Sequence, residues 1–149
     1  MIKDVLISIK GIQGIDDQTD TVEFITDGRF GIKDGNYFIS YDESGMLDKG
    51  EEVKTQIHIK GENKVLLKRS GTINSRMLIE KGVRNQAFYS TPIGELTIGI
   101  LGEEIDFKLN EKGGNIDLKY TIDSDLRLIS RNSVNITIKE VKNDVNFSN

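Results

Sequence analysis

The chain contains no cysteine, one histidine and one proline among its 149 residues. Without cysteine, disulfides, thiolate chemistry and cysteine-ligated metals are excluded. The one histidine, His58, cannot form a multi-histidine metal site, and no serine has a histidine and an acid placed as in a catalytic triad. We therefore expect no catalytic residues, no metal and no other cofactor. These expectations argue against an enzymatic function.

A long apolar run and a block of like charge are also missing. No stretch approaches the ~20 apolar residues of a membrane span, and the N-terminus lacks the apolar run of a signal peptide, so we expect a cytoplasmic protein of bacterial style. The 20 Lys and Arg and 24 Asp and Glu leave a net charge of −4, spread in both signs along the chain. Since nucleic acids select basic faces or stripes, this distribution predicts no nucleic-acid partner.

What the chain does have is alternation. Apolar residues occupy every second position in at least eight stretches, from Val5-Ile7-Ile9 to Val134-Ile136-Ile138. This period is typical of strands that bury one face and expose the other to water. The length fits one domain, and we predict an all-β fold over residues 1–149, a barrel or sandwich with little or no helix and a frayed tail over about residues 142–149.

Turn signals divide these stretches. Asp34-Gly35 is a strong hairpin signal, because both central residues of a type I′ turn need positive φ. The stretch from Gly11 to Asp20 is predicted to be a connecting loop, and Gly28 is a candidate bend in a long strand. Across Gly102–Glu104 the apolar residues change from even to odd positions, which requires a turn or a bulge. We favour a turn.

Polar residues in the apolar phase of a barrel must point inward, where they need partners. Arg69 shares parity with Val65 and Leu67, so its guanidinium is a candidate anchor for a carboxylate or phosphate of a ligand. The alternative is that Arg69 reaches solvent at the strand end or is neutralised by an internal acid.

Three tyrosines are also in the apolar phase. Tyr37, Tyr41 and Tyr120 each offer a hydroxyl at the end of an apolar body, which suits a pocket for an amphipathic molecule. Ordinary core packing is the alternative. Thr55 joins the inward set, whereas His58 is predicted to lie on the outer surface.

Several short motifs occur in a fixed order along nearly the whole chain. They are Val22-Glu23-Phe24 to Gly28, Tyr37-Phe38-Ile39-Ser40-Tyr41, Lys68-Arg69-Ser70-Gly71, Arg76, Gly82, Tyr89-Ser90-Thr91-Pro92-Ile93-Gly94, and Gly113-Gly114-Asn115-Ile116-Asp117-Leu118-Lys119-Tyr120. In this order they resemble the YwiB-type proteins, a bacterial family of uncharacterised small β-barrels with a calycin, lipocalin-like architecture. The resemblance implies a closed or nearly closed barrel in a cytosolic protein, with no assigned activity. The positions where its pattern coincides with groups able to bind something are Arg69, Arg76, Tyr41 and Tyr89.

Pattern and resemblance together predict an antiparallel up-and-down barrel of about 8–10 strands, calycin-like or lipocalin-like. We expect a non-enzymatic module that binds a small amphipathic or anionic ligand, and the candidate ligand-binding residues are Arg69, Arg76, Tyr37, Tyr41, Tyr89 and Tyr120. A cavity below the few hundred Å³ of ligand pockets, with Arg69 paired to an internal carboxylate, would argue against this expectation.

The alternative is a structural or protein-interaction barrel that acts through its outer surface or a homo-oligomer contact. It predicts a contiguous exposed apolar patch. The residues that would form it are out of phase with the core, such as Ile25, Phe38, Leu66 and Phe88.

Overall fold

A closed antiparallel barrel is formed by all ten strands of the computed structural model, which describes residues 1–43, 52–92 and 94–141. Each strand pairs with its neighbours in sequence, and β1 pairs with β10 to close the sheet. The strands are β1 (Ile2–Ile15), β2 (Gln18–Lys33), β3 (Asn36–Asp42), β4 (Val53–Lys60), β5 (Lys64–Gly71), β6 (Asn74–Glu80), β7 (Arg84–Thr91), β8 (Gly94–Asn110), β9 (Gly113–Ser124) and β10 (Arg127–Glu140). The predicted all-β, up-and-down barrel is confirmed.

No helix within the described ranges is long and apolar enough to cross a membrane. The frayed tail predicted over residues 142–149 lies outside the described residues.

The core consists of the alternating apolar residues that the sequence pattern identified. Side chains from both ends of the chain meet in it, because β1 and β10 are register partners, with Ile7 opposite Ile138 and Ile9 opposite Ile136. The most deeply buried apolar side chains are Val5, Ile7, Phe30, Ile39, Ile59, Val65, Ile79, Ile100, Ile116 and Ile136. Burial on this scale is the main favourable term in folding.

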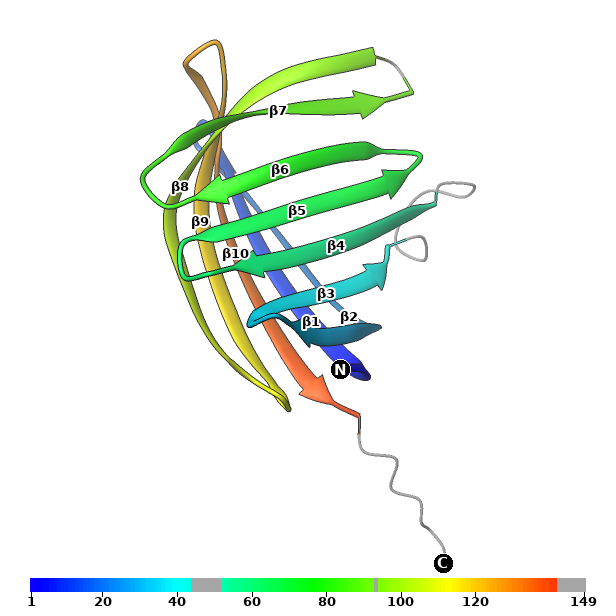
Figure 1. The fold of residues 1–149 in the computed structure, drawn as a ribbon. Helices are drawn as coiled ribbons and strands as arrows, with labels where there is room; N and C mark the ends of the chain where they lie inside the picture. The colour runs from blue at the N-terminus through cyan, green and yellow to red at the C-terminus, as the bar shows by residue number, and fades with distance from the viewer. Residues whose placement is uncertain (44–51, 93, 142–149) are drawn as a thin grey trace, which may run out of the picture.

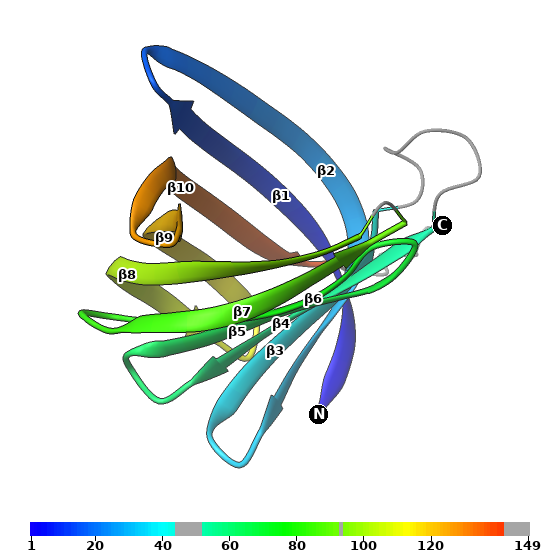
Figure 2. The same ribbon diagram turned by 90° about the horizontal axis from the view of Figure 1, so that it is seen from above.

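The strands are unequal in length. β1, β2, β8, β9 and β10 have 12 to 17 residues, whereas β3 to β7 have seven or eight. The short strands β4 to β6 form the front of the barrel in Figure 1. In the view from above, β1, β2 and β10 lie across the barrel from them (Figure 2). The turns β1–β2, β5–β6 and β9–β10 lie at one end of the barrel, which we call the mouth.

The turns test the sequence predictions directly. Asp34 and Gly35 have φ of 54° and 78°, so both central residues of the β2–β3 turn are in the left-handed region and the predicted hairpin is confirmed. The loop predicted from Gly11 to Asp20 is wrong. β1 continues to Ile15, and the two residues Asp16 and Asp17 turn directly into β2.

The change of phase near Gly102 is a bulge, and the predicted turn is wrong. β8 runs unbroken from Gly94 to Asn110, with Gly102 opposite Tyr120 and Glu104 opposite Lys119. Glu103 is the extra residue. A bulge suffices because one additional residue restores the inward direction of the following apolar side chains without interrupting the ladder.

Gly28 lies where β2 packs closely against both of its neighbours, β1 and β3. A Cβ at this position would meet Ile7 Cδ1 and would come within 2.6 Å of the Ser40 carbonyl oxygen. Gly11, on the adjacent strand, has nothing within 4 Å of the same point. The two glycines therefore have opposite steric roles.

We predict that Gly28→Ala lowers the free energy of unfolding by about 1–3 kcal/mol, the usual cost of overpacking. Gly11→Ala should leave stability unchanged or raise it by about 0.4–1 kcal/mol, because alanine restricts the unfolded chain. Urea denaturation of both variants checks this. Equal effects of the two substitutions would contradict the steric assignment.

A bidentate ion pair joins β7 to β9 across the outer face of β8. Arg84 Nη2 and Nε donate to the two carboxylate oxygens of Asp123 at 2.6 and 2.9 Å. The guanidinium lies over Gly99, where a Cβ would collide with it. Asp123 Oδ1 also accepts the Leu126 N–H at 3.2 Å, in a turn where Leu126 has a φ of 68°. The Arg84 hydrogen bond lowers the pKa of Asp123 below its ordinary value.

The lowered pKa of Asp123 determines how this ion pair's contribution to folding stability depends on pH. Because the folded carboxyl is more acidic than the unfolded one, its stabilising contribution is present above the unfolded value of ~3.9 and is lost as pH falls through the lower folded value. We predict that Asp123→Asn unfolds at a lower temperature than the wild type at pH 7, and that the difference shrinks below about pH 4. Thermal unfolding followed by circular dichroism measures both. A difference that is constant between pH 3 and pH 7 would rule out this role.

Candidate binding site at the barrel mouth

The barrel has a cavity of about 240 Å³ at its mouth. Strand alternation places it there, because the inward positions near this end of β3, β5 and β9 carry polar or amphipathic side chains instead of aliphatic ones. Tyr41, Glu43, Arg69 and Tyr120 supply the polar groups. The apolar wall consists of Ile9, Val22, Phe24, Ile57, Leu67, Ile79, Leu118, Val134 and Ile136.

Arg69 is neutralised by an acid inside the mouth. Its Nε lies 3.5 Å from Glu43 Oε2, and the two side chains are 33% and 13% exposed. Glu43 Oε2 also accepts the Thr55 hydroxyl at 2.7 Å, and Thr55 is buried, as its inward phase predicted. The carboxylate therefore joins two strands of the wall, β4 through Thr55 and β5 through Arg69.

The two tyrosines at the mouth stay protonated at neutral pH. Burial raises the pKa of Tyr41 far above 10, and the nearby Glu43 carboxylate raises it further. Burial likewise raises the pKa of Tyr120, although the Arg69 guanidinium opposes this shift. Both phenols are thus neutral hydrogen-bonding groups set in an apolar wall, and Tyr41 packs against Phe24 with ring centroids 6.1 Å apart.

The structure brings together three of the six candidate residues, Arg69, Tyr41 and Tyr120. Tyr37 lies toward the opposite end of the barrel, where its hydroxyl donates to the Leu109 carbonyl at 3.0 Å and its ring stacks on Phe30 at 5.9 Å. It is a core residue, which was the alternative for these tyrosines.

The other two candidates do not add to the site. Arg76 is exposed on the outer face of β6, between the inward-facing Ser75 and Met77. For Tyr89 the structure describes the backbone within β7, and the side chain lies outside what is described.

Glu43 is the residue that sequence reasoning missed. It follows directly after β3, beside a polar stretch that showed no strand pattern. A signal was present, since Glu43 continues the phase of Ile39 and Tyr41 and so should point inward. Its backbone N–H donates to the Val53 carbonyl at 2.8 Å, which extends the ladder and keeps the side chain inside.

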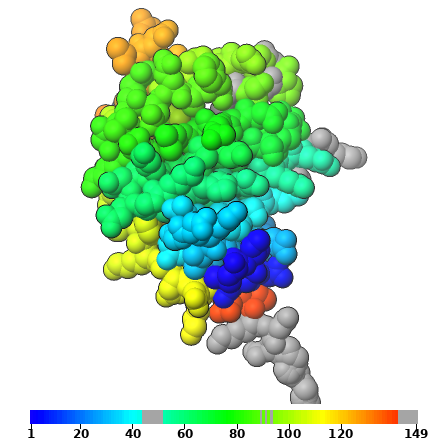
Figure 3. All heavy atoms as spheres, viewed as in Figure 1, coloured from blue at the N-terminus to red at the C-terminus, as the bar shows by residue number. Residues whose placement is uncertain are grey.

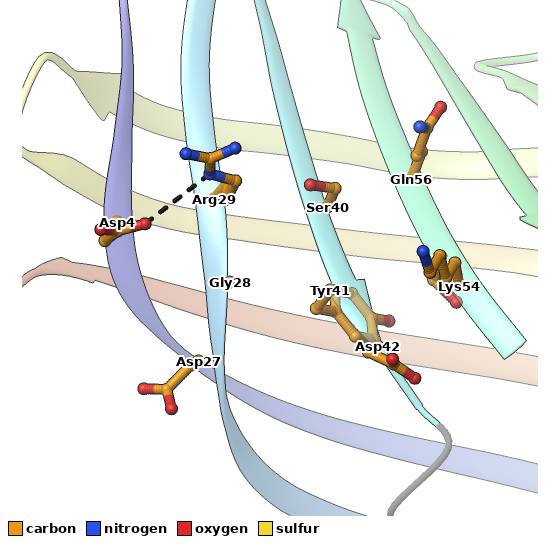
Figure 4. Close-up of a pocket in the computed structure, with 10 residues that line it drawn as sticks. Asp4, Asp27, Gly28, Arg29, Ser40, Tyr41, Asp42, Lys54 and Gln56 are labelled. Atoms are coloured by element: carbon orange, nitrogen blue, oxygen red, sulfur yellow. Dashed lines mark ion pairs between the residues drawn. The ribbon is translucent and has the colours of Figure 1, made fainter. Parts of the chain in front are cut away.

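A larger groove of about 440 Å³ lies across β1 to β4 on the outside of the barrel (Figure 4). It contains the ion pair between Arg29 Nε and Asp4 Oδ1 at 3.6 Å, and both of these side chains are well exposed. Exposed pairs contribute little, and the remaining polar side chains in the groove do not converge on a common point in Figure 4. No group of three or more His, Cys, Asp or Glu in the described ranges could hold a metal ion. The mouth cavity is therefore the better candidate site.

Comparison with known proteins places the barrel in a family. Residues 7–136 match the family described as Domain of unknown function (DUF1934), and the chain belongs to this family of β-barrel proteins. The chain is 28% identical to the Uncharacterized beta-barrel protein YwiB of Bacillus subtilis (strain 168) over 116 residues. The matched region covers 78% of this chain and 79% of that protein.

The crystal structure of the ywiB protein from Bacillus subtilis has the same fold. It superposes with a TM-score of 0.84 at 25% sequence identity, over 95% of this chain and 94% of the other. The resemblance inferred from short motifs is confirmed. The family's description assigns no activity, so function has to be argued from the site.

The contact between Glu43 and Arg69 makes a prediction about stability. Glu43→Leu removes the carboxylate that faces the Arg69 guanidinium and accepts the Thr55 hydroxyl, and we expect a loss of about 1–3 kcal/mol in the free energy of unfolding. Arg69→Met combined with Glu43→Leu should cost less than the sum of the single changes, with a coupling of about 0.5–3 kcal/mol. Chemical denaturation of the four proteins in this cycle measures the coupling. Strict additivity would show that the pair does not act as a unit.

Proposed function

We propose that the protein is a non-enzymatic module that binds a small amphipathic ligand in its mouth cavity. The observation that carries this is the arrangement of the wall. The neutral phenols of Tyr41 and Tyr120 and the Arg69–Glu43 ion pair interrupt an otherwise apolar surface. An apolar pocket with a few convergent polar groups is the usual form of a small-molecule site. Barrels of this class can enclose one small ligand.

The size of the cavity limits the ligand. Its 240 Å³ lies just below the ~300–1,000 Å³ of typical ligand pockets. The occupant would be small, or would leave part of itself in the mouth, where Val22 is 58% exposed.

The charge of the cavity favours a neutral or zwitterionic polar group over a bare anion. An anionic ligand would need the Arg69 guanidinium, but the Glu43 carboxylate already lies beside it and would repel a second negative charge. Of the two ligand classes expected from the sequence, the amphipathic one therefore has the better support. The pairing of Arg69 with Glu43 weighs against the anionic class, whereas the modest volume weighs against a pocket for either class.

The alternative function, a barrel that acts through an apolar outer patch, has weaker support. Ile25 and Phe88 are exposed, by 67% and 70%, but they lie on β2 and β7, with β3 to β6 between them. Leu66 is buried, and Phe38 is partly covered by its stacking on His58. These four residues do not form one patch. A cytoplasmic location stays a prediction.

Blocking the mouth should abolish binding. We predict that Val22→Trp, which places a large ring at the entrance, loses the fluorescence enhancement of phenylnaphthylamine, a neutral amphipathic dye. Ile25→Trp is the matched control, because the same change falls on the same strand but on the outer face. Native mass spectrometry of gently purified wild-type protein provides a second readout, in which a retained small molecule should disappear in Val22→Trp alone.

Two results would count against this function. One is a wild-type protein that carries no small molecule and does not enhance the dye. The other is equal enhancement with Val22→Trp and Ile25→Trp, which would place the dye outside the cavity. If the anionic dye anilinonaphthalene sulfonate bound more tightly than phenylnaphthylamine, the inference about Glu43 would be wrong.

A further inference from the structure

Positive charge gathers on the three short strands β4, β5 and β6. They carry six Lys or Arg side chains and one acidic side chain, Glu80, in a protein whose net charge is −4. Arg69 points into the mouth, and the other five lie on the outer surface. These outward cations are Lys54, Lys60, Lys64, Lys68 and Arg76.

Two of these cations are placed directly against each other. Lys68 on β5 is the register partner of Arg76 on β6, and like charges directly opposite in a sheet are destabilising. Neither side chain forms an ion pair within the described residues. By contrast, Lys54 has Asp42 as a register partner, and Lys64 has Glu80. The uncompensated charge is therefore concentrated at the centre of the face.

The one histidine lies within the positive electrostatic potential of these cations. His58 lies on the outer face of β4, as its phase predicted, and its ring stacks on Phe38 with centroids 6.2 Å apart. Its pKa is lowered by desolvation first, and then by the positive charges of Lys68, Lys60 and Arg76. Three cations thus converge around one aromatic, uncharged ring.

An exposed aromatic ring continues this row. Phe88 on β7 is the register partner of Arg76 and is 70% exposed, so the fold makes little use of its ring. The residues of β4 to β7 form one continuous surface on the front of the molecule (Figure 3). We call the surface defined by His58, Lys60, Lys68, Arg76 and Phe88 the basic face.

We propose that the basic face binds single-stranded nucleic acid. Cations at the spacing of neighbouring strands, ~4.8 Å, can follow a phosphate backbone, while exposed rings give bases a surface to stack on. An acidic peptide would use the cations but has no need of Phe88. A membrane surface would favour several protruding apolar groups, and one ring supplies little.

This inference runs against the expectation drawn from the linear charge pattern. That expectation depended on the lack of a basic block in the sequence. Lys60, Lys68 and Arg76 are eight residues apart in each case. Hairpin pairing places Lys68 directly opposite Arg76 and puts Lys60 on the same outer face of the adjacent strand β4. The proposed nucleic-acid binding is also independent of the mouth cavity, because the basic face lies on the outside of the barrel wall.

Fluorescence anisotropy with a labelled single-stranded RNA of mixed sequence tests the proposal on the full chain. Neutralising three or four phosphates predicts that affinity falls about 20- to 50-fold between 50 and 200 mM salt. Lys68→Glu/Arg76→Glu should weaken binding at least tenfold. Lys108→Glu/Lys139→Glu is the matched control, with the same charge change at exposed sites on β8 and β10, and it should bind within about twofold of the wild type.

Phe88→Ala separates stacking from simple charge attraction. It should weaken RNA binding about fivefold or more, in line with the loss of one stacked base, and leave binding of polyglutamate unchanged. No RNA binding at 50 mM salt would overturn the proposal, as would equal losses in the two charge-reversal variants. Polyglutamate binding as tight as RNA binding would assign the face to acidic proteins, and preferential binding to anionic phospholipid vesicles would assign it to membranes. Circular dichroism of each variant confirms folding.

Discussion

Pairing of the first strand with the last is the constraint on which the structure depends. The register between β1 and β10 extends over ten residue pairs, from Val5–Glu140 to Gly14–Arg131. Once this ladder forms, every strand has two neighbours, and neither β1 nor β10 offers an edge that could recruit another chain. Closure also determines where the alternating apolar residues lie, because the inward side chains of all ten strands then share one interior. Where those inward residues become polar, at the ends of β3 and β5, the interior becomes a site.

The sequence was sufficient for the fold but not for the site. Period-2 alternation and the Asp34-Gly35 turn identified strands and one hairpin correctly, because both are local consequences of backbone geometry. The bulge at Glu103 was misread, since a turn and a bulge produce the same phase change along the chain and differ only in pairing. Arg69 was correctly placed inward, but its partner Glu43 was missed. A contact between strands β3 and β5 depends on barrel curvature, which no local pattern records.

The wall of the barrel separates two electrostatic environments. Inside the mouth, Glu43 cancels the charge of Arg69, and burial keeps Tyr41 neutral. Outside, a few ångströms away through the same strand β5, Lys68 faces Arg76 without an acid between them. Lys68 and Arg69 are thus adjacent on β5 but lie in different electrostatic surroundings, one outside the barrel and one inside the mouth. Because a strand directs adjacent side chains to opposite faces, a single strand can carry two unrelated recognition surfaces.

The order of the strands also has a consequence for synthesis on the ribosome. Nine of the ten pairings join consecutive strands, so hairpins can form as soon as they emerge, and such local contacts favour fast folding. The tenth must wait for the C-terminal strand, which is made last. Until then the nascent sheet is an open ribbon, and the outer edge of β1 offers unpaired amides to any other nascent chain. A chaperone that shields this N-terminal edge would act in the interval between translation of β1 and release of β10.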